Sequence, residues 1–287
     1  MRFTKGHGTG NDFVVIPDPE GALEVTPTLV RALCHRRLGV GGDGVLRVVR
    51  TERAAQAPDI DVVAAPGGPD WFMDYRNADG SLAQMCGNGI RVFARYLVDR
   101  GLADPGRQYI GTRGGVRVVD VPEAGDITVD MGAPVLAGFP EAAQVGLAGV
   151  RYPARGLGMP NPHAVVMLPT LDGLPAALPA PDLDAADFPE GANVEFIAPL
   201  PRGSHGIRMR VYERGAAETL SCGTGACAAA VVASSLLPDL DGGPIRVEVP
   251  GGVLHVAFTP GGSVTMTGPA ALVADGTIRP QWLAEHS

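Results

Sequence analysis

The stretch Thr219–Val231, TLSCGTGACAAAV, places a cysteine directly before a Gly-x-Gly and an alanine-rich run. Glycines followed by small and apolar residues are typical of a helix start whose backbone N–H groups are open to a bound anion. The stretch Gln84–Val98, QMCGNGIRVFARYLV, has the same arrangement earlier in the chain, with Cys86 before Gly87-x-Gly89. The sequence therefore predicts two equivalent helices, each of which begins at a cysteine.

Other residues repeat together with the cysteines. Asn77 and Glu213 stand equally far before the two cysteines, and each ends a strand-like segment. Asn11 and Asn161 form a weaker echo, because each precedes a strand-like segment that contains Val-Val. Two similar half-molecules explain such a pattern. If they pack face to face, their equivalent loops meet at one cleft, and the two thiols then lie on opposite sides of one bound molecule.

The composition is that of a soluble globular chain, with 287 residues, 45% hydrophobic residues and a formal net charge of −8. Lys5 is the only lysine and the arginines are scattered, so no nucleic acid partner is expected. The apolar run Ala226–Leu237 is too short to span a bilayer, and the N-terminus lacks the apolar core of a secretory signal. We therefore predict a cytoplasmic protein without a membrane partner, whose four cysteines are free thiols.

Short segments rich in β-branched and aromatic residues predict strands in both halves of the chain. They are Asp12–Asp18, Gly44–Arg50, Asp70–Arg76 and Gly114–Val121 in the first half, and Asn161–Leu168, Asn193–Pro199, Ile207–Glu213, Ile245–Pro250, Gly252–Phe258 and Ser263–Gly268 in the second. Thr26-Pro27, followed by a helical period as far as Leu38, predicts a capped helix. The irregular apolar segment Pro134–Val150 is expected to be a crossover, and Ala54–Pro69 a loop insertion.

The glycines around the second cysteine also permit a dinucleotide site, because Gly223-x-Gly225-x-x-Ala228 matches a nucleotide-binding turn. In such a turn the first glycine follows the strand almost immediately. Here the loop RGAAETLSC separates Glu213 from the first glycine. A helix-start site for a substrate carboxylate fits better. A non-catalytic dinucleotide- or metabolite-binding module stays open as an alternative.

A thiol at a helix N-terminus has its thiolate favoured by the helix dipole, and a thiolate acts as a nucleophile or as a base. A cysteine protease or transferase needs one cysteine and a histidine, for which His163 is available. The duplication favours a base, because a thiolate and a thiol on opposite faces of a stereocentre can remove and deliver a proton. Cys34 and Cys227 are expected to be small buried hydrophobic residues.

Six motifs follow one another along the chain: GTGNDF (Gly8–Phe13), NADGSLAQMCGNGIR (Asn77–Arg91), NPH (Asn161–His163), NVEF (Asn193–Phe196), ERG (Glu213–Gly215) and ETLSCGTGACA (Glu218–Ala228). Together they resemble the diaminopimelate epimerases, pyridoxal-independent enzymes that interconvert L,L- and meso-diaminopimelate on the route to lysine and peptidoglycan. The resemblance implies an α/β (α+β) fold of two pseudo-symmetric domains, each a curved, mainly antiparallel sheet around a central helix, with the active site in the cleft between them. The implied halves are residues 1–133, to which 270–287 return, and residues 134–269.

The same resemblance assigns roles to individual residues. It implies that Cys86 and Cys222 are the two acid/base residues, and that His163 and Glu213 tune the two thiols. The substrate-binding positions it implies are Asn11, Asn77, Gly87, Asn88, Asn161, Asn193, Glu213, Arg214, Gly223 and Thr224. No cofactor and no metal are expected, because Lys5 lies in a predicted N-terminal strand away from both cysteine motifs and cannot serve as a pyridoxal Schiff base there.

Two positions depart from the family pattern. GGDG stands where many members have GADQ, so Gly44 lacks the glutamine amide, which a backbone group or a water would replace. Ala216-Ala217 follows the ERG motif where a glycine is common before the next glutamate. Arg214 and the asparagines favour a substrate with a second charged end, although a proline- or hydroxyproline-type racemase of the same fold stays open. We predict diaminopimelate as the small-molecule substrate and a homodimer as the assembly.

Overall fold

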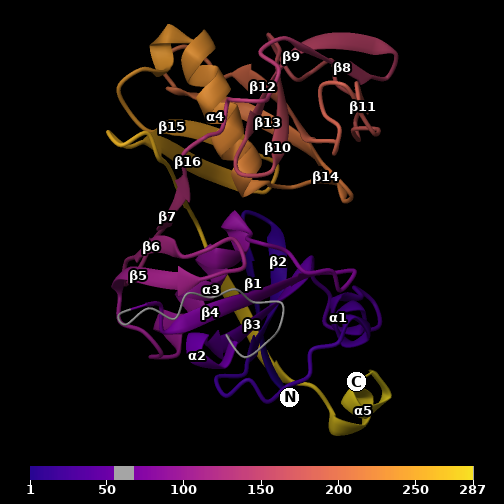
Figure 1. Cartoon of the computed structure of the whole chain (residues 1–287), viewed down its shortest axis with the longest axis vertical. Coiled ribbons are helices and arrows are strands. Elements are labelled where there is room, and N and C mark those ends of the chain that lie inside the picture. Colours follow the sequence, from indigo (N-terminus) through magenta and orange to yellow (C-terminus); the bar gives the residue numbers. More distant parts are fainter. Residues whose placement is uncertain (55–67, 287) are drawn as a thin grey trace. The chain divides into compact units, whose positions relative to one another are not determined.

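The computed structural model describes residues 1–54 and 68–286. The chain divides into two compact units, unit 1 (Met1–Val129 with Pro269–Ser287) and unit 2 (Asp130–Gly268). Each unit consists mostly of strands with few helices, so the predicted α+β class is confirmed (Figure 1). Residues 55–67, which make up most of the predicted loop insertion, lie outside the described part of the chain.

The sheet of unit 1 curves around helix α3 (Gly87–Asp99), which contacts the strand Ala271–Thr277 at one edge, the strand Arg117–Val121 near the other edge and four of the strands between them. Across the sheet the strands are β18 (Ala271–Thr277), β1 (Arg2–Gly8), β2 (Asn11–Pro17), β3 (Gly44–Arg50), β4 (Trp71–Asn77), β5 (Gly106–Gly111), β6 (Arg117–Val121) and the first residues of β7 (Ile127–Gly132). The other helices are α1 (Pro27–Cys34), α2 (Thr51–Ala54) and α5 (Pro280–His286).

The sheet of unit 2 surrounds helix α4 (Gly223–Leu236) in the same way, and α4 contacts strands from β9 to β17. Across this sheet the strands are β8 (Ala143–Leu147), β9 (Val150–Gly158), β10 (Pro162–Met167), β12 (Asn193–Pro199), β13 (Gly206–Glu213), β15 (Ile245–Val249), β16 (Gly252–Phe258) and β17 (Val264–Gly268). Short strands β11 (Asp182–Leu183) and β14 (Ala217–Thr219) pair with β8 and β13, and a 3₁₀ turn, η1 (Pro238–Leu240), follows α4.

The two units pair their strands in the same succession. In unit 1 every pair from β18 to β7 is antiparallel except β2–β3 and β4–β5, which are parallel. In unit 2 the parallel pairs are β10–β12 and β13–β15, at the same places in the order. The register then makes Phe13, opposite Gly44, equivalent to His163, opposite Asn193. Residues of the two units can therefore be compared position by position.

The alanines of α4 fit its central place. Ala226, Ala228, Ala229, Ala230 and Ala233 are all fully buried. A helix that is apolar on all sides is buried on all sides by the rest of the protein. The methyl side chains of alanine allow the surrounding strands to approach the helix axis closely. The alanine-rich run that follows Cys222 is thus a requirement of the fold around it.

Two local predictions were wrong. Helix α1 ends at Cys34 rather than at Leu38, because His35 leaves the helical region and its ring Nδ1 accepts the N–H groups of Arg37 and Leu38 at 3.2 and 3.0 Å. A histidine ring that competes with the helix for backbone donors gives no periodic signal in the sequence. The segment expected to be an irregular crossover, Pro134–Val150, contains strand β8, which pairs with β9.

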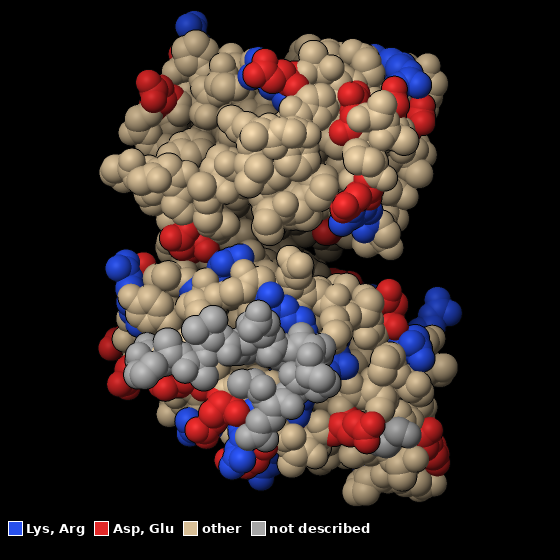
Figure 2. Space-filling view, viewed as in Figure 1, with Lys and Arg blue, Asp and Glu red and all other residues tan. Residues whose placement is uncertain are grey.

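The charged side chains are spread over the surface. Figure 2 shows basic and acidic side chains interspersed on the visible face rather than a single basic area. No helix in residues 1–54 and 68–286 is long and apolar enough to cross a membrane.

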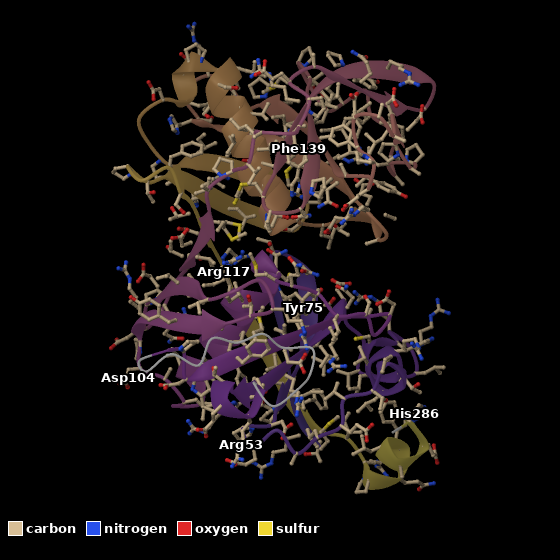
Figure 3. All side chains as sticks on the ribbon, in the orientation of Figure 1. Arg53, Tyr75, Asp104, Arg117, Phe139 and His286 are labelled. Atoms are coloured by element: carbon tan, nitrogen blue, oxygen red, sulfur yellow. The ribbon has the colours of Figure 1, made fainter. Side chains whose placement is uncertain are left out.

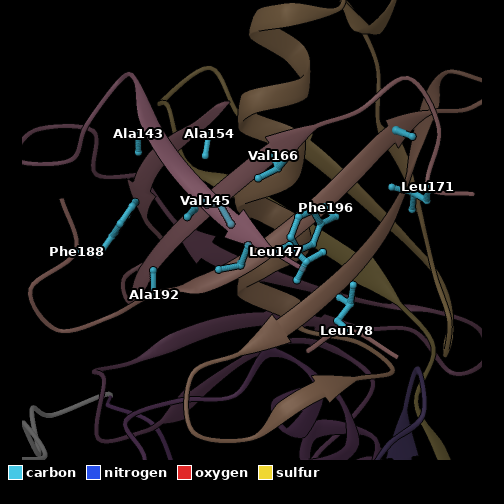
Figure 4. Packing of buried hydrophobic residues seen from close by; sticks show 13 residues of the cluster. Ala143, Val145, Leu147, Ala154, Val166, Leu171, Leu178, Phe188, Ala192 and Phe196 are labelled. Atoms are coloured by element: carbon cyan, nitrogen blue, oxygen red, sulfur yellow. The ribbon is translucent and has the colours of Figure 1, made fainter. Parts of the chain in front are cut away.

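Phe196 tests the core of unit 2. It lies fully buried on β12 in a cluster with side chains of β8, β9 and β10 (Figure 4). We predict that Phe196→Ala lowers the free energy of unfolding by about 3–5 kcal/mol, because it removes buried ring contacts and leaves a cavity. Phe258→Ala is the matched control, since Phe258 is 42% exposed, and should cost less than about 1 kcal/mol. Urea unfolding followed by circular dichroism measures both; equal losses would contradict the assignment of this core.

Candidate active site

Cys86 is the N-cap of α3. Its backbone is extended, with φ −140° and ψ 119°, and its Sγ accepts the N–H of Gly89 at 3.4 Å. Cysteine takes here the place that serine, threonine or aspartate usually fills at a helix start. The N–H of Gly89 and the positive end of the helix dipole favour negative charge on this sulfur.

Asn11 presents its amide oxygen to Cys86. Oδ1 of Asn11 lies 3.6 Å from Sγ of Cys86 as the acceptor of the thiol hydrogen, and it also accepts from Nδ2 of Asn88 at 3.3 Å. Nδ2 of Asn11 donates to Oδ2 of Asp43 at 2.7 Å. An ionised carboxylate can only accept, so Asp43 fixes which end of the Asn11 amide is the nitrogen.

Arg91 is a fully buried arginine that holds the loops of this half-site together. Its guanidinium donates to Oδ1 of Asn88 at 3.0 Å, to Oγ1 of Thr9 at 3.3 Å and to two backbone carbonyls, those of Gly87 and Pro269. Thr9 belongs to the two-residue turn between β1 and β2, where it adopts a positive φ of 49°. Arg91 thus fixes the position of that turn against the start of α3.

Asn77 ends β4 opposite Gly44, and its Nδ2 donates to Oγ of Ser81 at 3.0 Å. A Cβ on Gly44 would lie 2.5 Å from the carbonyl oxygen of Arg76 and 2.6 Å from Cε2 of Tyr75. The ring of Tyr75, labelled in Figure 3, therefore occupies the space that a side chain at position 44 would need. Position 44 is therefore a glycine because the Tyr75 ring leaves no room for a side chain there.

Cys222 is the N-cap of α4, with φ −120° and ψ 118°, and is 6% exposed. Its Sγ accepts the N–H of Gly225 at 3.4 Å, lies 3.4 Å from Oγ1 of Thr224 and accepts from Nδ2 of Asn193 at 3.9 Å. Oδ1 of Asn193 accepts the backbone N–H of Arg214 at 2.8 Å, which fixes the orientation of this amide. The asparagine beside Cys222 therefore presents nitrogen, whereas the asparagine beside Cys86 presents oxygen.

Buried acid/base groups surround Cys222. His163 and Glu195 are both fully buried, with Nδ1 of His163 2.7 Å from Oε1 of Glu195, and Nε2 of His163 lies 3.2 Å from Oδ1 of Asn161. The other carboxylate oxygen of Glu195, Oε2, has no hydrogen-bond partner among the described residues. Glu213 accepts from Oγ1 of Thr219.

Burial is the largest cause that raises the pKa of the Cys222 thiol well above its ordinary value. The carboxylates of Glu213 and Glu195 raise it further, while the contacts with Thr224 and the N–H of Gly225 lower it. Burial also raises the pKa of the Glu213 carboxyl, against the hydrogen bonds from Thr219 and Cys222. Burial therefore favours the protonated, neutral forms of Cys222 and Glu213.

Equivalent places in the two units hold different side chains. A Cβ on the third residue of α3 would lie 3.4 Å from the ring of Phe13 and 3.3 Å from Leu46. A Cβ on the third residue of α4 would lie 2.6 Å from Oε1 of Glu195. By strand register Phe13 matches His163 and Leu46 matches Glu195. An apolar pair thus lies behind the first cysteine and a buried acid/base pair behind the second.

The residues singled out in the sequence gather at the two helix starts. Unit 1 brings together Cys86, Gly87, Asn88 and Asn11, with Asn77 at the end of β4; unit 2 brings together Cys222, Gly223, Thr224, Asn193, Glu213, His163 and Asn161. Arg214 takes part through its backbone, because its guanidinium is half-exposed and donates to the carbonyl of Glu190 at 2.7 Å.

Sequence reasoning missed three residues of these half-sites, namely Asp43, Arg91 and Glu195. Each lies within or beside a quoted motif. The signal for Glu195 was a carboxylate inside the otherwise apolar segment NVEFIA, whose residues are all buried. A charged residue at a fully buried strand position needs a partner, and His163 on the adjacent strand is that partner.

No group of three or more His, Cys, Asp or Glu in residues 1–54 and 68–286 is arranged to hold a metal ion. The four cysteines, all within the described residues, are thiols rather than disulfides.

The model of the diaminopimelate epimerase family matches residues 3–137 and 157–273. The chain belongs to this family. It is 48% identical to the diaminopimelate epimerase of Streptomyces coelicolor, over 99% of this chain and 97% of that protein, and 48% identical to that of Thermobifida fusca, over 97% and 98%. Among solved structures, a phenazine biosynthesis protein of the PhzF family from Bacillus anthracis has the same fold, with a TM-score of 0.66 at 17% identity over 97% of this chain and 99% of that one.

Whether His163 and Glu195 act as a pair can be tested by replacing them with the residues at the equivalent positions of unit 1, phenylalanine and leucine. We predict that Glu195→Leu alone lowers the free energy of unfolding by about 3–5 kcal/mol, because it leaves His163 buried without its partner. The double variant His163→Phe with Glu195→Leu should return to within about 1 kcal/mol of the wild type, since an apolar pair of similar size replaces a buried polar pair at little cost. Urea unfolding measures both. Additive losses in the double variant would show that the two residues do not act as a pair.

Proposed function

We propose that the protein interconverts L,L- and meso-diaminopimelate by proton transfer between one α-carbon and the thiols of Cys86 and Cys222. The observation that carries the proposal is the duplication, in which two cysteines cap equivalent helices in two units with the same strand pairing. Inversion at carbon needs a base on one face and an acid on the other. Membership of the diaminopimelate epimerase family supports the substrate.

In the proposed reaction one cysteine, as thiolate, takes the α-proton and becomes a thiol. The electron pair stays on the α-carbon, and the other thiol delivers its proton to the opposite face and becomes a thiolate. No oxidant or reductant is consumed. Both sulfurs must therefore reach the same α-carbon, at about 3 to 3.5 Å from the reacting atoms in a near-attack arrangement.

The helix starts supply the stabilisation that this carbanion needs. The substrate carboxylate would take up charge as the α-proton leaves, and the N–H groups at Gly87 and Asn88 and at Gly223 and Thr224 would donate to it. Preorganised donors of this kind contribute roughly 3 kcal/mol each in a site without water. Cysteine as the N-cap is what places a sulfur next to these donors.

We propose that the carboxylate of Glu213 accepts the proton of the Cys222 thiol when the thiolate forms. Burial raises the pKa of both groups, and they share a hydrogen bond. A carboxylate whose pKa lies above its ordinary value is a stronger base and accepts a thiol proton more readily. The ammonium group of a bound amino acid would then favour the thiolate, because an opposite charge nearby lowers the pKa of the thiol.

The second amino-acid centre of the substrate calls for further polar partners, and we assign them to Asn77, Asn161 and Arg214. A guanidinium grips a carboxylate through two parallel hydrogen bonds. Arg214 is half-exposed, so it can exchange the carbonyl of Glu190 for a substrate carboxylate. The cytoplasmic location, the homodimer and the independence from a cofactor stay predictions from the sequence.

The test is turnover of L,L-diaminopimelate by purified protein in heavy water, without added pyridoxal phosphate or metal. We expect meso-diaminopimelate that carries one deuterium at the inverted α-carbon, because a thiol proton exchanges with solvent before it is delivered. L-Proline and trans-4-hydroxy-L-proline serve as control substrates and should not be converted. Racemisation of proline, or activity that appears only when pyridoxal phosphate is added, would contradict the proposal.

A further inference from the structure

Asp43 lies directly before β3 and uses both of its carboxylate oxygens within unit 1. Oδ2 accepts from Nδ2 of Asn11 at 2.7 Å and from the backbone N–H of Asp12 at 3.1 Å. Oδ1 accepts from Nη2 of Arg36 at 2.6 Å. The arginine and the backbone of β2 therefore hold the carboxylate in place beside the Asn11 amide.

This contact determines what Asn11 offers to Cys86. The two ends of an amide are nearly equal in size, so an asparagine can turn over and exchange oxygen for nitrogen when its partners allow it. Here a turn would bring Oδ1 of Asn11 against Oδ2 of Asp43, where neither atom has a hydrogen to donate. Asn11 is thus held with its oxygen 3.6 Å from Sγ of Cys86.

The sulfur of Cys86 lies between two opposite influences. The N–H of Gly89, 3.4 Å away, and the start of α3 favour the thiolate. The oxygen of Asn11 favours the thiol, because only a protonated sulfur has a hydrogen to donate to it. The balance between the two forms depends on which end of the Asn11 amide faces the sulfur.

We propose that Asp43 is a positioning residue which, through Asn11, holds Cys86 as a hydrogen-bond-donating thiol in the protein without substrate. The significance of this state rests on the proposed function, in which Cys86 is one of the two acid/base groups. Asp43 acts on the sulfur through the asparagine, whose Nδ2 donates to the Asp43 carboxylate.

The second unit lacks this arrangement. By register Ala192 stands where Asp43 stands in unit 1, since each precedes the first residue of an equivalent strand. Cys222 instead meets the nitrogen of Asn193, whose oxygen is held by the backbone N–H of Arg214. The two sulfurs thus have opposite hydrogen-bond roles towards their asparagines, Cys86 as donor and Cys222 as acceptor.

The experiment measures the alkylation rate of each cysteine in the full-length chain, with iodoacetamide at pH 7 and peptide mass spectrometry. In Asp43→Ala, Nδ2 of Asn11 loses its carboxylate acceptor while Nδ2 of Asn88 still donates to Oδ1. The amide is then held less firmly with its oxygen towards the sulfur, so Cys86 should react about three- to tenfold faster, the factor that one neutral hydrogen bond is worth. Cys222 should change less than about twofold, since the hydrogen bonds of Asp43 described above are to residues of unit 1, and it serves as the internal reference. An unchanged Cys86 rate, or an equal change at both cysteines, would overturn the proposal.

Two controls separate positioning from a general structural effect. Arg36→Ala removes the ion pairs to Asp43 and Asp12 but leaves the acceptor for Asn11, so the Cys86 rate should stay near that of the wild type. Asn11→Ala should raise the rate as Asp43→Ala does, and combining the two should give no further increase. Additive effects, or the same acceleration in Arg36→Ala, would contradict action through Asn11.

The Asp43 variants are expected to fold. The Asp43 side chain is 41% exposed, and Asp43→Ser provides a second truncation if the alanine variant does not fold. No substrate is used, so the alkylation result stands whether or not diaminopimelate is turned over. Conversely, a failure of the turnover assay would leave the assignment of Asp43 intact as a statement about the Cys86 thiol.

Discussion

The hydrogen bond from a helix-start N–H to a cysteine sulfur is the contact on which the rest of the molecule depends. It occurs twice, from Gly89 to Cys86 and from Gly225 to Cys222, at 3.4 Å in both cases. Each helix begins with Gly-x-Gly, and the strands of a curved sheet pack around each helix. The fold and the proposed chemistry thus share one requirement, a sulfur beside the backbone N–H groups of a helix start.

The residues around Cys86 differ from those around Cys222. Phe13 lies beside the first helix start, whereas the equivalent His163 forms a buried pair with Glu195 in the second. A carboxylate fixes the asparagine beside Cys86, and a backbone N–H fixes the one beside Cys222. In the proposed two-base reaction one sulfur carries a proton while the other does not, and the neighbours of the two sulfurs differ in their hydrogen-bond roles. The differences between the two halves are therefore as informative as the repeat.

Much of this arrangement could be predicted from the sequence, because its signals are local. Strands β3, β12 and β16 have the predicted bounds, since β-branched residues between glycines and prolines mark a strand in any context. The contacts made across the fold could not be predicted. The ring of Tyr75 against Gly44, the His163–Glu195 pair and the ring of His35 that ends α1 depend on neighbours that only the folded chain brings together.

The most direct test of the two-cysteine account removes one sulfur at a time and follows exchange instead of turnover. In heavy water, Cys86→Ala and Cys222→Ala should each lose epimerisation by orders of magnitude, because one face of the α-carbon loses its acid or base. The remaining thiolate can still remove and return a proton on its own face. Each variant should therefore take up deuterium in one epimer only, with retained configuration, and the two variants should choose opposite epimers. Exchange of the same epimer by both variants, or near wild-type epimerisation by either, would contradict the account.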